Sequence, residues 1–513
     1  MLKTYSTIST ILALLVTVGC QKLDEDPKGN LTPSSFTSQK DLDAAVAGIY
    51  EVYAWDGAYG FTSRMTSYFG SDDLTTDPGL NKADMRDFDR LNGSSTNGSM
   101  NAEWEGPWRA IYNANSVIAN YQRIKSDESL KTLAAGQAYF LRAWGYYMLV
   151  RTFGQLPLVL EPLDADARPP REEVSKIYEA IISDLKTAKS MLPAPNGPNY
   201  PWKSQPGRVN QFAARALLAD VYLTMTGWPI NQNSNYALAA TEADSLIKQN
   251  FYDVNTPYDK VFSTNGSSES IFSLYFKVSG NLPQRSFGSS SVPLDESGID
   301  GSGGWDDYYP EINFYLKAPA CSRTNATFHT TIKLKKSGNT FKLVTWNSNE
   351  THAGHPYFNK FRAGLNGDGV KETDTSILSI NPSTNKALDI IRYPMVLLDY
   401  AEASAIANNA PTAASYSAVN TVRRRAGLPD LTPGLSATSF RDSVVFERAY
   451  EFAGEFGIRW FDIVRLQLLP KINAERNALE NPIVPADIST RYLAPIPFNE
   501  MLRNPGWKQN SGY

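Results

Sequence analysis

Residues on which many active sites depend are scarce in this sequence. Its 513 residues include only two cysteines, Cys20 and Cys321, and three histidines, His329, His352 and His355. If Cys20 is used otherwise, neither a disulfide nor a zinc cluster built from cysteines can form. A catalytic apparatus that relies on several histidines is excluded as well.

An excess of basic charge is also missing. Lys and Arg number 49 and Asp and Glu number 53, so the formal net charge is −4. This balance excludes a generally basic nucleic-acid binder, although not a local basic patch. The sequence has no Gly-x-Ser-x-Gly elbow, phosphate-binding Walker loop, dinucleotide fingerprint or His-Glu-x-x-His motif.

Long apolar runs are limited to residues 8–18, near the N-terminus. This run follows Lys3 and ends at Gly19-Cys20. It has the length of a signal-peptide core and is too short to cross a bilayer. Gly19-Cys20 resembles a bacterial lipobox, although Thr17 departs from the usual apolar residue. We therefore expect a signal peptide over 1–19 and lipidation of Cys20; the alternative is ordinary signal cleavage beside a chance cysteine.

The residues after Cys20 predict a polar tether over 20–38. Its acidic stretch, 24–26, resembles the surface-export tag of lipoproteins that reach the outer face of the outer membrane. No later apolar run is long enough for a transmembrane helix.

Most of the remaining chain shows the apolar periodicity of amphipathic helices. In one such stripe, the spacing of Trp104 and Trp108 assigns both side chains to the core, and Trp144 is assigned likewise. The predicted helices cover 41–55, 103–124, 128–153, 171–192, 209–225, 235–249, 394–409, 412–426 and 439–455.

These helices form pairs that predict a mainly α fold. The pattern is a degenerate repeat of tetratricopeptide-like helical hairpins, which build an α-α superhelix. We expect repeats at about 39–250 and 391–470. Between them, residues 251–390 are rich in Gly, Ser, Asn and Thr and contain strand-like runs at 271–278 and 330–334. Ligand binding usually resides in such a loop-rich insertion.

Five segments resemble the signatures of one family. The run Arg-Tyr-Pro-x-x-Leu-Leu-x-Tyr-Ala-Glu-Ala begins at Arg392, and Glu and Arg recur at spacings of three or four over 447–465. The others are Gly-x-x-Pro-Leu-Val within 153–159, Gly-Arg before the helix at 209–225, and the Pro- and Asn-rich close at 492–513. In this order, they make the chain similar to the SusD/RagB family of outer-membrane nutrient-binding lipoproteins.

The resemblance implies a single SusD-like domain over 39–513 and a function. Such a protein is lipid-anchored in the outer membrane and faces the cell exterior. It binds a nutrient oligosaccharide and delivers it to a SusC-like TonB-dependent transporter, without catalysis and without a cofactor. From the residues alone, the charged run at 447–465 predicts structural ion pairs with one another or with loops.

Aromatic residues are abundant, at 12% of the chain, and the face of an aromatic ring can stack on a sugar. We expect the ligand site on loops where aromatic and hydrogen-bonding side chains gather. Trp55 and Tyr59 are a second candidate edge of the ligand site, and Trp346 is a third candidate. The main candidates lie within 281–315: Arg285, Trp305, Asp306, Asp307, Tyr308, Tyr309 and, beside them, Tyr315.

Two other functions are consistent with the sequence. A glycoside hydrolase needs two opposed carboxylates, for which the adjacent Asp306 and Asp307 are poorly placed. A peptide-binding lipoprotein is consistent with a tetratricopeptide-like fold.

The sequence offers two weak metal-binding motifs. His352 and His355 lack an evident third ligand, and 366–369 is interpreted as a turn rather than a calcium loop. We therefore expect no metal site.

Overall fold

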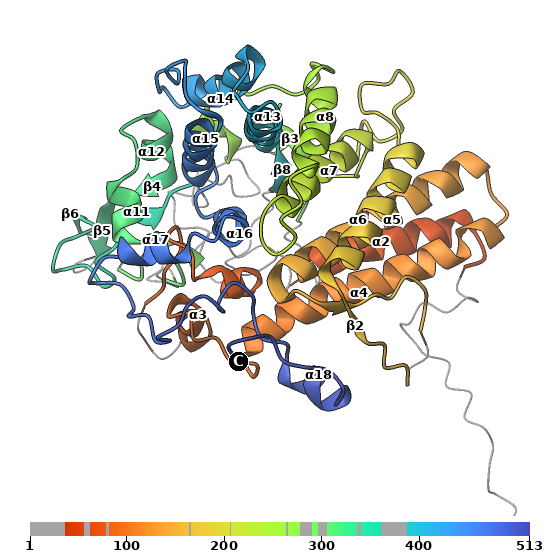
Figure 1. The fold of residues 1–513 in the computed structure, drawn as a ribbon, viewed down its shortest axis with the longest axis horizontal. Coiled ribbons are helices and arrows are strands. Elements are labelled where there is room, and N and C mark those ends of the chain that lie inside the picture. Colours follow the sequence, from red (N-terminus) through yellow and green to blue (C-terminus); the bar gives the residue numbers. More distant parts are fainter. Residues whose placement is uncertain are drawn as a thin grey trace, which may run out of the picture.

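Helices dominate the computed structural model and follow one another in an arc (Figure 1). Among the residues that the structure describes, no helix is both long and apolar enough to cross a membrane. The described residues are 36–55, 62–77, 79, 82–163, 166–205, 207–262, 265–276, 290–295, 305–335, 340–360 and 387–513.

The first half of the arc is a row of helices in which each packs on the next. Several begin where a short polar side chain accepts hydrogen bonds from free backbone N–H groups, as Ser38, Asn97 and Asn210 do. The row consists of α2 (Gln39–Ala54), α4 (Gly98–Asn120), α5 (Glu128–Phe153), α6 (Val174–Met191), α7 (Gln211–Met225) and α8 (Asn235–Ile247), with η2 (Thr62–Tyr68), α3 (Ala83–Asp89), η4 (Tyr121–Arg123), β1 (Leu156–Pro157) and β2 (Arg171–Glu172) in the connections.

The row continues without a break after the insertion. Helix α8 packs directly on α13 (Tyr393–Ala407), although more than a hundred residues separate them in the sequence. Helix α13 in turn packs on α14 (Ala413–Arg425) and α15 (Ala437–Glu451). The mainly α, tetratricopeptide-like fold is therefore confirmed. The chain ends with α16 (Ile458–Arg465), α17 (Leu469–Ala474) and α18 (Phe498–Arg503), the last within the tail expected to be irregular.

The insertion contains short strands and short helices. Its entry strand β3 (Ser270–Leu274) pairs antiparallel with its exit strand β8 (Leu388–Arg392). The predicted strand at 330–334 corresponds to β5 (Thr331–Lys335), whose hairpin partner β6 (Phe341–Thr345) the sequence did not predict. The other elements are α9 (Tyr258–Val261), α11 (Ile312–Leu316), α12 (Ser322–Thr327), β4 (Phe328–His329) and β7 (Tyr357–Phe358). In Figure 1, α11, α12 and β4–β6 lie at the left edge, near α15 and α17.

Buried ion pairs connect the insertion to the helical row. Arg392, Arg425 and Glu451 are nearly inaccessible to solvent; both arginines bind Glu451 and also Glu269, which immediately precedes β3. Burial alone raises the pKa of Glu451, but the charges of Arg425, Arg392 and Arg323 lower it to about 2. The charged run at 447–465 thus pairs largely with residues of other elements.

The helix expected over 439–455 ends earlier, at Glu451. Gly454 and Gly457 follow, with φ of 73° and 78°. Residues with a side chain are strained at these angles, whereas glycine adopts them readily. The two glycines therefore allow the backbone to turn before α16 begins at Ile458.

Candidate ligand-binding site

The loop with most of the predicted ligand-binding residues pairs with a segment from the N-terminal part of the chain. The Thr75 N–H donates to the Tyr309 carbonyl at 2.8 Å, and the Tyr309 N–H donates to the Thr75 carbonyl at 3.1 Å. The Thr76 hydroxyl donates to the Asp307 carbonyl at 2.7 Å. Residues 305–310 are therefore fixed in position by residues far earlier in the sequence.

The adjacent carboxylates Asp306 and Asp307 are buried and have different partners. Asp307 forms an ion pair with Lys82. Asp306 accepts a hydrogen bond from the Tyr357 hydroxyl and lies 2.9 Å, through Oδ2, from His352 Nδ1. Burial raises the pKa of both aspartates.

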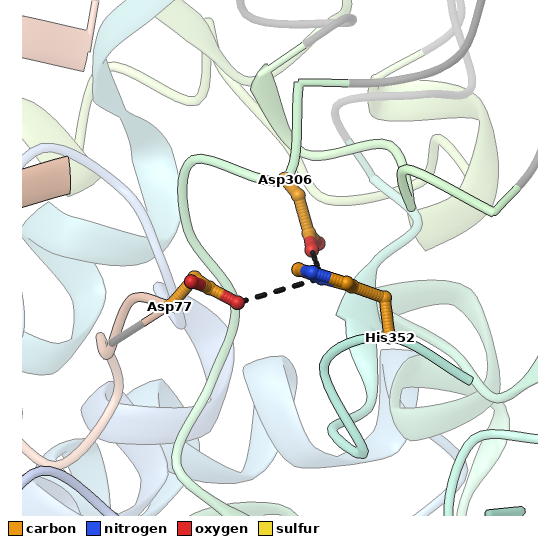
Figure 2. A group of neighbouring side chains, drawn as sticks. All are labelled: Asp77, Asp306 and His352. Atoms are coloured by element: carbon orange, nitrogen blue, oxygen red, sulfur yellow. Dashed lines mark hydrogen bonds and ion pairs between the residues drawn. The ribbon is translucent and has the colours of Figure 1, made fainter. Parts of the chain in front are cut away.

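His352 lies between two carboxylates from separate parts of the chain. Its Nδ1 is 2.9 Å from Asp306 Oδ2 and 3.4 Å from Asp77 Oδ2, as Figure 2 shows. Burial alone lowers the pKa of His352, but its bond to Asp306 and the charges of Asp306, Asp77 and Asp295 raise it overall. His355 instead lies 3.0 Å, through Nε2, from Glu480 Oε2. The two histidines thus have different partners.

Tyr308 and Tyr309 are almost completely buried, at 0% and 1% exposure. The Tyr309 ring packs on His355 and Tyr357, with centroids 4.6 and 5.4 Å away, and the Tyr308 ring packs on Phe358 at 5.8 Å. Rings in this position stabilise the fold. The Gly- and Ser-rich surroundings argue against a buried strand, yet residue 309 forms an isolated β-bridge with Thr75, and both rings are inside.

The predicted tryptophans remain partly accessible. Trp305 and Trp346 are half-buried, and Trp346 packs edge-on against Tyr315 with centroids 5.8 Å apart. Trp55 is 42% exposed at the end of α2. Of the predicted aromatic side chains, Trp55, Trp305, Trp346 and Tyr315 thus keep part of their surface accessible, and Trp55 lies on α2, away from the β5–β6 hairpin beside which Trp346 packs. Three other predicted residues, Cys20, Tyr59 and Arg285, lie outside the described residues, as does the turn at 366–369.

A hollow of about 550 Å³ was missed by the sequence interpretation. Trp104, Trp108 and Trp507 line it together with charged side chains, including Arg109 and Glu105. Trp104 is buried, as expected, and so is Trp144, but Trp108 is only half-buried. Since Trp507 comes from the distant C-terminal tail, no local pattern could have placed it beside α4.

Comparison with known proteins gives a consistent result over the whole chain. A family model described as "Starch-binding associating with outer membrane" matches residues 22–223, and the SusD family model matches residues 186–513. SusD-like protein P2 of Formosa agariphila is 30% identical, with 99% of each chain covered.

Solved structures show the same fold. A SusD homolog from Bacteroides thetaiotaomicron superposes with a TM-score of 0.78 at 23% identity, covering 94% of this chain and 98% of that one. Surface glycan-binding protein A from Bacteroides uniformis has a TM-score of 0.75 at 21% identity, with 92% and 99% covered. From the family model and the full-length relative, this chain belongs to the SusD family.

Proposed function

We propose that this protein binds an oligosaccharide at the cell surface and delivers it to a SusC-like TonB-dependent transporter, without catalysis. The observation that carries the proposal is the full-length match to the SusD family, which includes a model described as starch-binding and outer-membrane-associated. The similar fold of a surface glycan-binding protein supports the same function.

The local chemistry favours binding over hydrolysis. A glycoside hydrolase needs two carboxyl groups that face each other across a sugar, about 5–10 Å apart. Asp306 and Asp307 are neighbours in the chain, and each already binds partners of its own.

We assign the oligosaccharide to the accessible parts of the half-buried rings of Trp305 and Trp346, with the exposed Trp55 as a separate candidate. Arg285 and Tyr59 remain candidates from the sequence.

Replacing Trp305 with alanine should weaken binding to an oligosaccharide identified on a glycan array by about 10- to 100-fold. The reason is that loss of one stacking ring removes on the order of 1–3 kcal/mol of binding free energy. Calorimetry with purified protein measures the affinity, and thermal unfolding checks that the melting temperature hardly changes.

Trp507→Ala is the matched comparison, because Trp507 is half-buried like Trp305 but lines the hollow beside α4. We expect this variant to keep the parent affinity. The opposite pattern, with binding lost in Trp507→Ala and kept in Trp305→Ala, would move the site to the Trp104–Trp108–Trp507 hollow. Sugar release would instead indicate a hydrolase, and retention of peptides without glycans would indicate a peptide-uptake protein.

Lipidation and transporter binding can be tested in one membrane preparation. The parent protein should remain with the outer membrane and, after mild detergent extraction, bring down a β-barrel of roughly twice its length, as the family resemblance implies. Cys20→Ser should be soluble, because it lacks the lipid attachment atom. Membrane partition of Cys20→Ser equal to that of the parent would contradict lipidation, and repeated recovery of a clean monomer would contradict the transporter complex.

A further inference from the structure

Three side chains with metal-binding atoms converge beside the candidate ligand site. Asp77, Asp306 and His352 come from three separate segments, and one potential ligand atom from each lies within 4.8 Å of the other two. Figure 2 shows both carboxylates directed toward the same edge of the imidazole. The three residues are far apart in the sequence, so they come together only in the folded chain.

Among the residues that the structure describes, the charge of this group is unbalanced. A third carboxylate, Asp295, accepts a hydrogen bond from the His352 backbone N–H at 2.6 Å. Three aspartates thus surround one imidazole, which carries at most one positive charge. Within the described part of the chain, no Lys or Arg forms an ion pair with Asp77, Asp295 or Asp306.

Two buried aspartates nearby, in contrast, form ion pairs with basic side chains. Asp307, the next residue, is paired with Lys82, and Asp89 is paired with Arg476. Isolated buried carboxylates are costly unless a cation or hydrogen bonds compensate them. The Asp77–Asp306–His352 group therefore has the negative charge that a divalent cation would balance.

The spacing also suits a metal ion. Zinc binds imidazole nitrogen and carboxylate oxygen at about 2.0–2.2 Å, so two ligands of a tetrahedral site lie about 3.3 Å apart. His352 Nδ1 lies 2.9 and 3.4 Å from the two carboxylate oxygens. The Tyr357 hydroxyl holds the other oxygen of Asp306, a contact of the kind that orients metal ligands.

The geometry points to a site for a divalent transition-metal ion, of the zinc class, formed by Asp77, Asp306 and His352. An imidazole ligand favours such an ion over calcium, which takes oxygen ligands. The His352 side chain is 45% exposed, so water or an oxygen of a bound ligand can complete the coordination. The site does not depend on the proposed glycan function, because it rests on these three residues alone.

The test uses purified full-length protein stripped of metal with a chelator. Zinc chloride titrated at pH 7 should bind with one ion per chain and raise the melting temperature, and cobalt(II) should give a visible absorption band. Asp77→Asn and His352→Gln should each weaken zinc binding at least 10- to 100-fold, since loss of a direct ligand costs no less than loss of a supporting contact.

His329→Gln is the control, because it removes another imidazole and leaves the three ligands intact. It should bind zinc as the parent does, and circular dichroism should show that all variants are folded. The proposal is overturned if the folded parent binds no zinc, if it prefers calcium, or if His352→Gln binds zinc with the parent affinity. If the folded parent binds no zinc, a protonated His352 that bridges Asp77 and Asp306 explains why the three side chains lie together.

Discussion

Arg425→Ala should lower the free energy of unfolding by about 3–5 kcal/mol, the usual effect of removing one partner from a buried ion pair. The Arg425 side chain is 5% exposed and forms ion pairs with both Glu269 and Glu451. Without it, Glu269 would keep only Arg392, which also binds Glu451, so part of the buried negative charge would be uncompensated although Arg323 still binds Glu451. Denaturation in urea, followed by circular dichroism, measures the change.

The neighbouring residue on the same helix provides the control. Arg424 also forms a salt bridge, with Asp430, but this pair is exposed to solvent. Water screens such pairs, so Arg424→Ala should leave the midpoint of unfolding almost unchanged. Equal destabilisation by the two variants would show that helix α14, rather than the buried ion pairs, determines the effect.

Trp144→Ala should be destabilising to a similar degree, by about 3–5 kcal/mol, because it leaves a large cavity in a packed core. Trp144 is 2% exposed, and its ring centroid lies 4.3 Å from that of Tyr53 on α2 and 4.9 Å from that of Phe272 on β3. The residue therefore joins three elements. Thermal unfolding monitored by calorimetry measures the loss.

Leu130→Ala tests whether this loss comes from the core. Leu130 lies on the same helix, α5, but is 42% exposed. Its replacement should shift the melting temperature far less than Trp144→Ala does. A small shift for Trp144→Ala would mean that neighbouring side chains collapse into the space and that the contact with β3 contributes little.

The sequence predicted the helices well because their signal is local. The helix expected over 128–153 has these bounds in the structure, and the one expected over 209–225 begins two residues later, at Gln211. Apolar periodicity and capping residues lie within each segment, so a single stretch of sequence suffices to locate a helix.

The candidate site was harder to predict because its geometry comes from distant segments. Tyr309 is buried by pairing with Thr75, and Asp306 meets His352 and Asp77 only in the folded chain. The sequence shows no third ligand for the histidines, because Asp77 and Asp306 lie far from His352 along the chain. Composition indicated an exposed loop, whereas long-range pairing determines which of its side chains face solvent.

The pairing of β3 with β8 has a consequence for how the family can diversify. Because the strands that open and close the insertion lie side by side, the chain leaves the helical row and returns to it at one place. Helices α8 and α13 pack together across that place. Insertions and deletions between these strands therefore leave the helical row intact where the intervening residues do not contact it, whereas residues 305–310 are bound to Thr75 and Thr76 and have to be kept.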